Sequence, residues 1–219
     1  MATDVLSAEE THVAELTDQL IAQNPPSKTS AIAFLGAQFD LGLAWIHFPV
    51  GHGGLGLSPK FQKIVNEKIA RAGGPNSYAR NPIGYGMCGP TVVEWGTEDQ
   101  KRRYLRPLFT GEEIWCQLFS EPGAGSDLAG LSTRAVRDGD EWVINGWKFY
   151  SSNARTASFL IVMVVTNPDV SAYQGMSMFL VPTDTPGVKI VRNLASGLEP
   201  DEMASHALIH YDNVRVPNE

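Results

Sequence analysis

Residues 118–127 read LFSEPGAGSD, and they stand where the sequence changes from helical to strand-like patterning. Up to Gly111 the apolar residues recur every three or four positions, which is typical of helices, whereas beyond it they alternate. The run leaves a predicted strand and turns at its glycines, where backbone amides can converge on an anion without obstruction by side chains. It therefore predicts a phosphate-binding turn, with a plain Gly- and Pro-rich β-turn as the alternative.

The sequence before this run predicts helices. Ser7 with Glu10 and Thr97 with Gln100 form capping boxes, in which side chains satisfy the free backbone amides at a helix start. Asn24-Pro25-Pro26 ends the first helical pattern, because proline has no amide to donate. The predicted helices cover approximately residues 8–22, 31–41, 59–72, 85–95 and 98–108.

The sequence after this run predicts strands, because β-branched and aromatic residues alternate between turn sequences. Asn145-Gly146 is the strongest hairpin signal among those turns. The fold class is therefore α+β, with an all-helical domain over residues 1–112 and an antiparallel β domain over residues 113–219. The predicted strands cover residues 114–119, 132–137, 141–144, 147–150, 159–166, 176–181 and 207–216.

Composition limits the classes of partner. The chain has 219 residues, a formal net charge of −7 and no run rich in lysine and arginine, which argues against a nucleic-acid partner. Cys88 and Cys116 have no CxxC spacing, and this fits a reducing compartment. The aliphatic run at residues 159–165 is far shorter than the roughly 20 residues of a membrane-spanning helix. We therefore expect a cytoplasmic protein without a membrane anchor or a secretory signal.

Two motifs suggest other ligands, and their context argues against both. Residues 51–56, GHGGLG, match the GxGxxG pattern of dinucleotide-binding folds, but Pro49 stands where a buried strand would run. No acidic residue follows about 20 positions later to bind a ribose hydroxyl, so a loop between helices is expected. His206 and His210 lie in a strand pattern, where four positions span about 13 Å, too far to share a metal ion. We expect two ordinary strand histidines and no metal site.

A second informative run, VINGWKFYSSN, occupies residues 143–153. It predicts a hairpin turn followed by a strand that ends in Tyr150, Ser151 and Ser152. The Tyr150 ring can lie against a planar heterocycle, and the Ser152 hydroxyl, two positions on, should point to the same side of the strand. The alternative is an aromatic core strand that ends in a polar turn.

At these residues the sequence resembles the acyl-CoA dehydrogenase family, and the resemblance covers nearly the whole chain. It implies an N-terminal helical domain followed by a middle β-barrel domain, with FAD held non-covalently between the barrel and helices. The segments that carry it, in the order of the family, are FPVGHGGLGLS at 48–58, GTEDQKRRYLRPLFTGE at 96–112, SEPGAGSD at 120–127, INGWKFYSSNA at 144–154 and YDNVRVP at 211–217.

The resemblance also implies which residues hold the flavin. Ser120 would lie near the ring edge, Tyr150 against the isoalloxazine ring, and Ser152 toward its N5 side. Gly125 and Ser126 would form the phosphate turn, and Ser126 would also approach the substrate thioester. The family usually has Trp at the position of Tyr150 and often Thr at the other two ring positions, so an aromatic face and the hydroxyls are kept. The full implied set is Gln117, Phe119, Ser120, Gly125, Ser126, Tyr150, Ser151 and Ser152.

The reaction of the family removes a proton α to a thioester and transfers a hydride from the β carbon to flavin N5, which yields a 2-enoyl-CoA. The proton is removed by a glutamate of a C-terminal helical domain, and this sequence stops at Glu219, just after the stretch that leads into that domain. No catalytic residue is therefore assigned in this chain. Glu121, the acid nearest the site, is expected to belong to the turn.

The resemblance leaves two main functions open. The chain is either the FAD-binding portion of an acyl-CoA dehydrogenase, as a fragment or as a subunit completed by a partner, or a non-catalytic binding and assembly subunit of the same fold. Acyl-CoA oxidases and flavin monooxygenases are a third, related class. The implied partners are an acyl-CoA substrate, an electron-transferring flavoprotein, and further subunits in a homo- or hetero-oligomer. The absent domain should leave apolar faces exposed, so that the isolated chain binds FAD weakly and associates.

Overall fold

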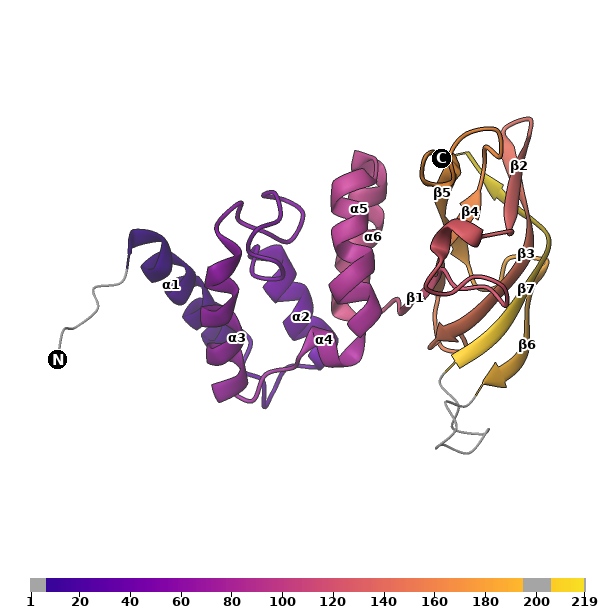
Figure 1. The fold of residues 1–219 in the computed structure, drawn as a ribbon. Coiled ribbons are helices and arrows are strands. Elements are labelled where there is room, and N and C mark those ends of the chain that lie inside the picture. Colours follow the sequence, from indigo (N-terminus) through magenta and orange to yellow (C-terminus); the bar gives the residue numbers. More distant parts are fainter. Residues whose placement is uncertain (1–6, 195–205, 219) are drawn as a thin grey trace. The chain divides into compact units, whose positions relative to one another are not determined.

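The computed structural model describes residues 7–194 and 206–218, in which the helices precede the strands. The chain divides into two units, Met1–Glu113 and Ile114–Glu219. The first unit is helical and the second is built on one sheet (Figure 1). The α+β fold class is confirmed. In the described part of the chain, no helix is both long and apolar enough to span a membrane.

Local sequence signals account for most helix boundaries in the first unit. Ser7 caps the first helix, and Glu10 closes the capping box by accepting the Ser7 amide at 2.7 Å. Gly111 ends the last one in a left-handed conformation at φ 72°, which glycine adopts without strain. The helices are α1 (Ala8–Gln23), α2 (Ala31–Asp40), α3 (Gln62–Arg71), α4 (Ser77–Arg80), α5 (Gly89–Trp95) and α6 (Glu98–Thr110), with a 3₁₀ turn at Pro59–Phe61 and a π-turn at Gly84–Cys88.

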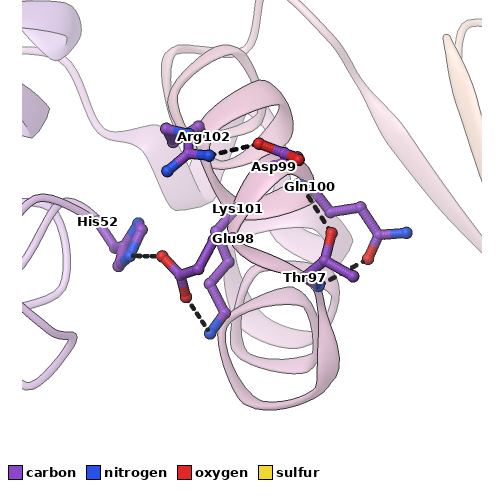
Figure 2. A network of polar contacts seen from close by, with 7 residues as sticks. All are labelled: His52, Thr97, Glu98, Asp99, Gln100, Lys101 and Arg102. Carbon is purple, nitrogen blue, oxygen red and sulfur yellow. Dashed lines mark hydrogen bonds and ion pairs between the residues drawn. The ribbon is translucent and has the colours of Figure 1, made fainter. Parts of the chain in front are cut away.

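The start of α6 carries a network of polar contacts that also holds a distant loop (Figure 2). The Thr97 amide donates to Gln100 Oε1 at 3.0 Å, and the Gln100 amide donates to Thr97 Oγ1 at 3.2 Å, which is the predicted capping box. Glu98 lies between Lys101 at 3.0 Å and Nε2 of His52 at 3.1 Å. The glycine-rich loop at residues 51–56 is thereby tied to α6.

That glycine-rich loop connects α2 to the 3₁₀ turn, as the sequence predicted. The amides of Ala44 and Trp45 both donate to the carbonyl of Gly53, at 3.1 and 3.0 Å. A Cβ atom at Gly54 would lie 2.1 Å from the carbonyl oxygen of Phe48, so only glycine fits. Close packing explains Gly53 and Gly54, and a positive φ explains Gly51 and Gly56, so the loop's own structure accounts for its glycines.

The second unit is a seven-stranded curled sheet with the order β1-β4-β2-β3-β7-β6, in which β5 also pairs with β4 (Figure 1). Most neighbours are antiparallel, but β1 runs parallel to β4, and β2 meets β4 in one parallel pair. Parallel strands need a long connection, and β2 with β3 supplies it between β1 and β4. The strands are β1 (Trp115–Leu118), β2 (Arg134–Asp138), β3 (Glu141–Ser152), β4 (Phe159–Val165), β5 (Met176–Pro182), β6 (Val188–Leu194) and β7 (His206–Pro217).

The predicted hairpin at Asn145-Gly146 is wrong, because β3 runs through it as one strand of 12 residues. A register shift against β7 marks a β-bulge between Ile144 and Gly146. The Asn145 side chain pairs with Asn213, whose amide donates to Asn145 Oδ1 at 2.8 Å. A Cβ atom at Gly146 would lie 2.5 Å from Thr133 Oγ1. The glycine therefore serves the bulge, and the hairpin lies earlier, at residues 138–141.

The core of the β unit lies inside the curled sheet. Leu118 of β1, Leu160 of β4 and Ile209 of β7 are fully buried in it. Tyr211 is also fully buried, and burial holds the pKa of its hydroxyl well above the ordinary value. This core fixes the ends of β1, β3 and β7, from which the candidate site is built.

Candidate functional site

A buried ion pair anchors the run at residues 118–127. Lys148 Nζ lies 2.8 Å from Glu121 Oε1, and both side chains are almost completely buried. The same ammonium donates to the carbonyl of Phe119 at 3.1 Å. One side chain of β3 therefore fixes two consecutive parts of the loop. Because a buried charge without a partner is costly, the pair determines where this loop leaves the sheet.

The Glu121 carboxylate is saturated with donors. The Ser132 amide and hydroxyl each donate to Oε2 at 2.7 Å, and the Thr133 amide donates to Oε1 at 3.0 Å. Burial alone would raise the pKa of Glu121, but hydrogen bonds from Lys148, Thr133 and Ser132 lower it to about 2. A carboxylate held in this way is an anchor and not a proton acceptor, which agrees with the expectation that it belongs to the turn.

Glu121 also begins a tight turn. Its amide donates to the Ala124 carbonyl at 2.7 Å, and the Ala124 amide donates back at 3.1 Å. Pro122 and Gly123 form the tip. This closed turn places the following two residues, Gly125 and Ser126, on the exposed side of the loop.

Open space surrounds the glycines of this loop. A Cβ atom built at Gly123 or at Gly125 would have no neighbour within 4 Å, and neither residue has a positive φ. The loop therefore lacks the left-handed residue of an alternating nest, and its glycines offer room instead. Within the described residues, no hydrogen bond uses the amides of Gly125 and Ser126. These two amides can donate hydrogen bonds to an anion.

The end of β3 is joined to the same loop. The Phe149 amide donates to the Ser120 carbonyl at 2.8 Å. The next residue, Tyr150, has φ 52°, which is uncommon for a residue other than glycine, and it lies in a register shift between Lys148 and Ser151. This bulge leaves the Tyr150 side chain 53% exposed. An aromatic face is thus presented beside a loop with free amides.

The bulge changes the expected alternation of side chains at the end of β3. Lys148 and Ser151 are both buried although three positions separate them. The Ser151 hydroxyl has no hydrogen-bond partner among the described residues, and the whole residue, backbone included, is buried. Ser152 Oγ lies 2.9 Å from Nδ1 of His206, and the ring of that histidine lies 5.9 Å from the Tyr150 ring. Tyr150 and Ser152 therefore share one neighbour.

Besides Ser151 and Ser152 at the end of β3, the six other predicted residues divide into three groups in the structure. Phe119, Ser120 and Tyr150 are brought together by the contacts between the loop and β3. Gly125 and Ser126 extend from this point on the exposed side of the turn. Gln117 is half-buried on β1, paired with Ile161 of β4.

Sequence reasoning missed the residues that hold the site in place: Lys148, Ser132, Thr133 and His206. Lys148 could have been singled out, because it is a charged residue in a strand of aromatic residues. A lysine side chain that points into the core from such a strand needs an acidic partner. The partner lies 27 positions away, so the sequence could not identify it.

The two histidines of β7 are strand residues, as expected. His206 contacts Ser152, whereas His210 stacks on Trp147 with ring centroids 4.2 Å apart. No group of three or more His, Cys, Asp or Glu side chains in the described ranges is arranged to hold a metal ion.

Family comparison agrees with this geometry. The N-terminal domain of acyl-CoA dehydrogenases matches residues 10–112, and the middle domain matches residues 116–214. The two matches cover most of the chain. The chain therefore belongs to the acyl-CoA dehydrogenase family.

Individual relatives carry the same family name. The chain is 43% identical over 149 residues to acyl-CoA dehydrogenase IpdE1 of Mycobacterium tuberculosis, a match that covers 68% of this chain and 38% of the relative. It is 32% identical over 183 residues to the human mitochondrial short-chain specific acyl-CoA dehydrogenase, covering 82% of this chain and 42% of that protein. The chain thus spans less than half the length of these two relatives.

Solved structures share the fold. The Tcur3481-Tcur3483 steroid ACAD aligns with a TM-score of 0.66 and 30% identity, over 98% of this chain and 56% of the matched chain. The ChsE4-ChsE5 complex of Mycobacterium tuberculosis aligns with a TM-score of 0.67 and 29% identity, over 98% and 56%. The acyl-CoA dehydrogenases found in these comparisons are oxidoreductases.

Proposed function

We propose that this chain is the FAD-binding portion of an acyl-CoA dehydrogenase, which oxidises an acyl-CoA thioester to a 2-enoyl-CoA. The observation that carries the proposal is the anchored loop: free amides at Gly125 and Ser126 and the exposed Tyr150 ring belong to segments joined by the Glu121–Lys148 ion pair. A dinucleotide with a planar ring and a pyrophosphate needs these two features at fixed spacing.

The residues of this chain fit that cofactor. Tyr150 offers the isoalloxazine ring an aromatic face, and the hydroxyls of Ser120 and Ser152 offer its edge hydrogen bonds. The amides of Gly125 and Ser126 would bind a phosphate, where the absence of a side chain at Gly125 leaves room for close approach. Ser126 would also contact the thioester. When bound, the flavin supplies the hydride acceptor that no amino-acid side chain can provide.

The second requirement of the reaction is a base for the α proton. Glu121 cannot fill this role, because hydrogen bonds from Lys148 and residues 132–133 occupy it and keep its pKa near 2. The proposal therefore assigns the base to the C-terminal helical domain that the family has, which is either a continuation of this polypeptide or part of a partner subunit.

Anaerobic addition of acyl-CoA esters of several chain lengths to the FAD-loaded chain tests this function. Bleaching of the visible flavin absorbance shows that reduction needs nothing beyond this chain, which would contradict the assignment of the base. No bleaching alone, with bleaching on addition of the remaining domain or partner subunit, is the expected result. A chain that cannot be loaded with FAD contradicts the proposal as a whole.

The alternative function is a non-catalytic subunit of the same fold that completes the site of a partner. Two of the similar solved structures support this alternative. The ChsE4-ChsE5 structure is a complex of two proteins, and the Tcur3481-Tcur3483 steroid ACAD carries two protein names. Mixing experiments separate the two: a non-catalytic subunit activates its partner without bleaching its own flavin. An electron-transferring flavoprotein as acceptor and a cytoplasmic location belong to the same proposal.

Exposed apolar side chains are consistent with assembly into an oligomer. In the helical unit Trp95 is 78% exposed and Tyr78 57%, and in the β unit Tyr173 is 81% exposed. Large apolar side chains in water favour burial against another surface. Association of the isolated chain, measured by sedimentation at increasing concentration, is the expected behaviour.

A further inference from the structure

We propose that His206 is a positioning residue for the flavin, which sets the direction of the hydrogen bond made by the Ser152 hydroxyl. The proposal rests on the proposed function. It concerns a contact inside this chain, however, which can be measured with and without FAD.

The register of the sheet places the two residues opposite each other. Ser152 is the last residue of β3, His206 is the first of β7, and they form the terminal pair of that ladder. On its other side His206 pairs with Leu194 of β6, which is buried. The backbone of His206 is thus paired with a strand on each side, and its Nδ1 lies 2.9 Å from Ser152 Oγ.

The same imidazole packs against the predicted aromatic face. Its ring lies 5.9 Å from the Tyr150 ring at an interplanar angle of 75°, an edge-to-face arrangement. Tyr150 has a positive φ, so its position is set by the surrounding contacts and not by backbone preference. His206 therefore contacts two of the residues that are predicted to meet the flavin ring, Tyr150 and Ser152.

A hydroxyl has one hydrogen to donate, and the partner decides where that hydrogen goes. If Nδ1 of His206 accepts, the Ser152 hydrogen is used, and only oxygen lone pairs face the ligand. If Nδ1 carries a hydrogen and donates, the Ser152 hydrogen is free to be donated to the ligand. The tautomer of His206 thus determines whether Ser152 offers a donor or an acceptor.

This direction matters for a flavin because N5 accepts a hydrogen bond in the oxidised ring and carries a hydrogen in the reduced ring. A donor at Ser152 favours the oxidised form, and an acceptor favours the reduced form. His206 should therefore change the relative affinity of the chain for the two forms, and so the reduction potential, without contacting the ring itself.

Potentiometric titration of FAD-loaded wild-type chain, His206→Phe and His206→Asn tests the proposal. Phenylalanine keeps an aromatic ring against Tyr150 but loses the hydrogen bond, whereas the asparagine amide can replace Nδ1. We expect His206→Phe to change the ratio of affinities for oxidised and reduced FAD about tenfold, which is about 30 mV for a two-electron couple. His206→Asn should restore most of it. His210→Gln, on the same strand and stacked on Trp147, is the matched control and should have the wild-type potential.

Nitrogen-15 NMR of histidine-labelled chain supplies a readout that does not need FAD. The Nδ1 shift of His206 should report a hydrogen bond that disappears in Ser152→Ala. Retention of that shift in Ser152→Ala, or a wild-type potential in a folded His206→Phe, overturns the proposal while leaving FAD binding intact. Failure of the wild-type chain to bind FAD overturns the proposed function, and this inference with it.

Discussion

The two glycine-rich loops of this chain, at residues 51–56 and 123–125, differ in the structural reason for their glycines. At residues 51–56 each glycine has a positive φ or lies against the backbone or rings of its own unit, so backbone conformation or packing disfavours a side chain. At residues 123–125 the glycines have neither feature, and their Cβ positions face open space. A glycine that neither backbone conformation nor packing within the chain requires leaves room for a ligand to approach the backbone. The comparison separates a structural loop from a candidate binding loop without reference to any motif.

The loops also differ in how they are held. The first is tied to α6 by His52 and Glu98, and the Glu98 side chain is 60% exposed. The second is tied to β3 by Glu121 and Lys148, both almost completely buried. Exposed pairs contribute little to stability, whereas breaking a buried pair is costly. The binding loop is therefore the one whose anchor should be most sensitive to mutation.

Lys148→Met should have the largest effect, because it leaves the Glu121 carboxylate buried without its cation. We expect the free energy of unfolding at neutral pH to fall by about 3–5 kcal/mol in urea titrations. Hydrogen exchange should rise at residues 119–133 and stay unchanged at residues 51–56. Lys189→Met, which removes the exposed pair with Asp212, is the control and should cost at most about 1 kcal/mol. Equal losses in the two variants would remove the distinction between the anchors.

Acid should weaken the same anchor. The folded-state pKa of Glu121 is lowered from 4.5 to about 2, so its contribution is complete above about pH 4.5 and is lost as the pH falls toward 2. The loss in free energy of unfolding is of the order of 3 kcal/mol across that window. In Glu121→Gln this part of the pH dependence should disappear, while the contributions of exposed carboxylates remain. Parallel pH profiles of wild type and variant would show that the pair is not the acid-sensitive element.

Gly54→Ala tests the structural loop. The added methyl group would lie 2.1 Å from the Phe48 carbonyl oxygen, so the backbone must move, at a cost of about 1–3 kcal/mol. Thermal unfolding measures this loss. FAD affinity should remain unchanged, because the loop lies in the helical unit and is predicted to serve packing alone. A loss of FAD binding without a loss of stability would reverse the assignment of the two loops.

Gly125→Ala should have the smallest effect on stability, and of the opposite sign. With open space around the Cβ and no positive φ, alanine restricts the unfolded chain and should stabilise the fold by up to about 1 kcal/mol. Gly86→Ala in the π-turn has the nearest neighbour at 3.8 Å and serves as the matched control. A destabilised Gly125→Ala would show that the loop packs more closely than its geometry indicates.

The features that the sequence predicted are those with local causes. The capping boxes at Ser7 and Thr97 are each complete within four residues, and the helices begin where these residues indicate. The turn at Glu121 is likewise closed by two residues three positions apart in its own run. Proline, glycine and capping residues act on their neighbours, so no tertiary information is needed.

The features that the sequence missed depend on distant partners. Asn145-Gly146 has the local form of a hairpin, but Asn213 and Thr133 make it a bulge in a continuous strand. Strand β6 was not predicted, because as an edge strand it carries charged side chains and little buried surface. The contacts of Lys148 and His206 join segments 27 and 54 positions apart.

Equilibrium dialysis of the wild-type chain against increasing FAD, read by the visible spectrum, tests the central claim that the loop anchored by Glu121 and Lys148 binds a flavin. The account predicts saturable binding, with excess flavin on the protein side of the membrane. It also predicts an affinity at least about tenfold weaker, or about 1.4 kcal/mol, in Gly125→Val, with Gly86→Ala unchanged. Wild-type chain that takes up no flavin at saturating FAD, or folded Gly125→Val with the wild-type affinity, would contradict it.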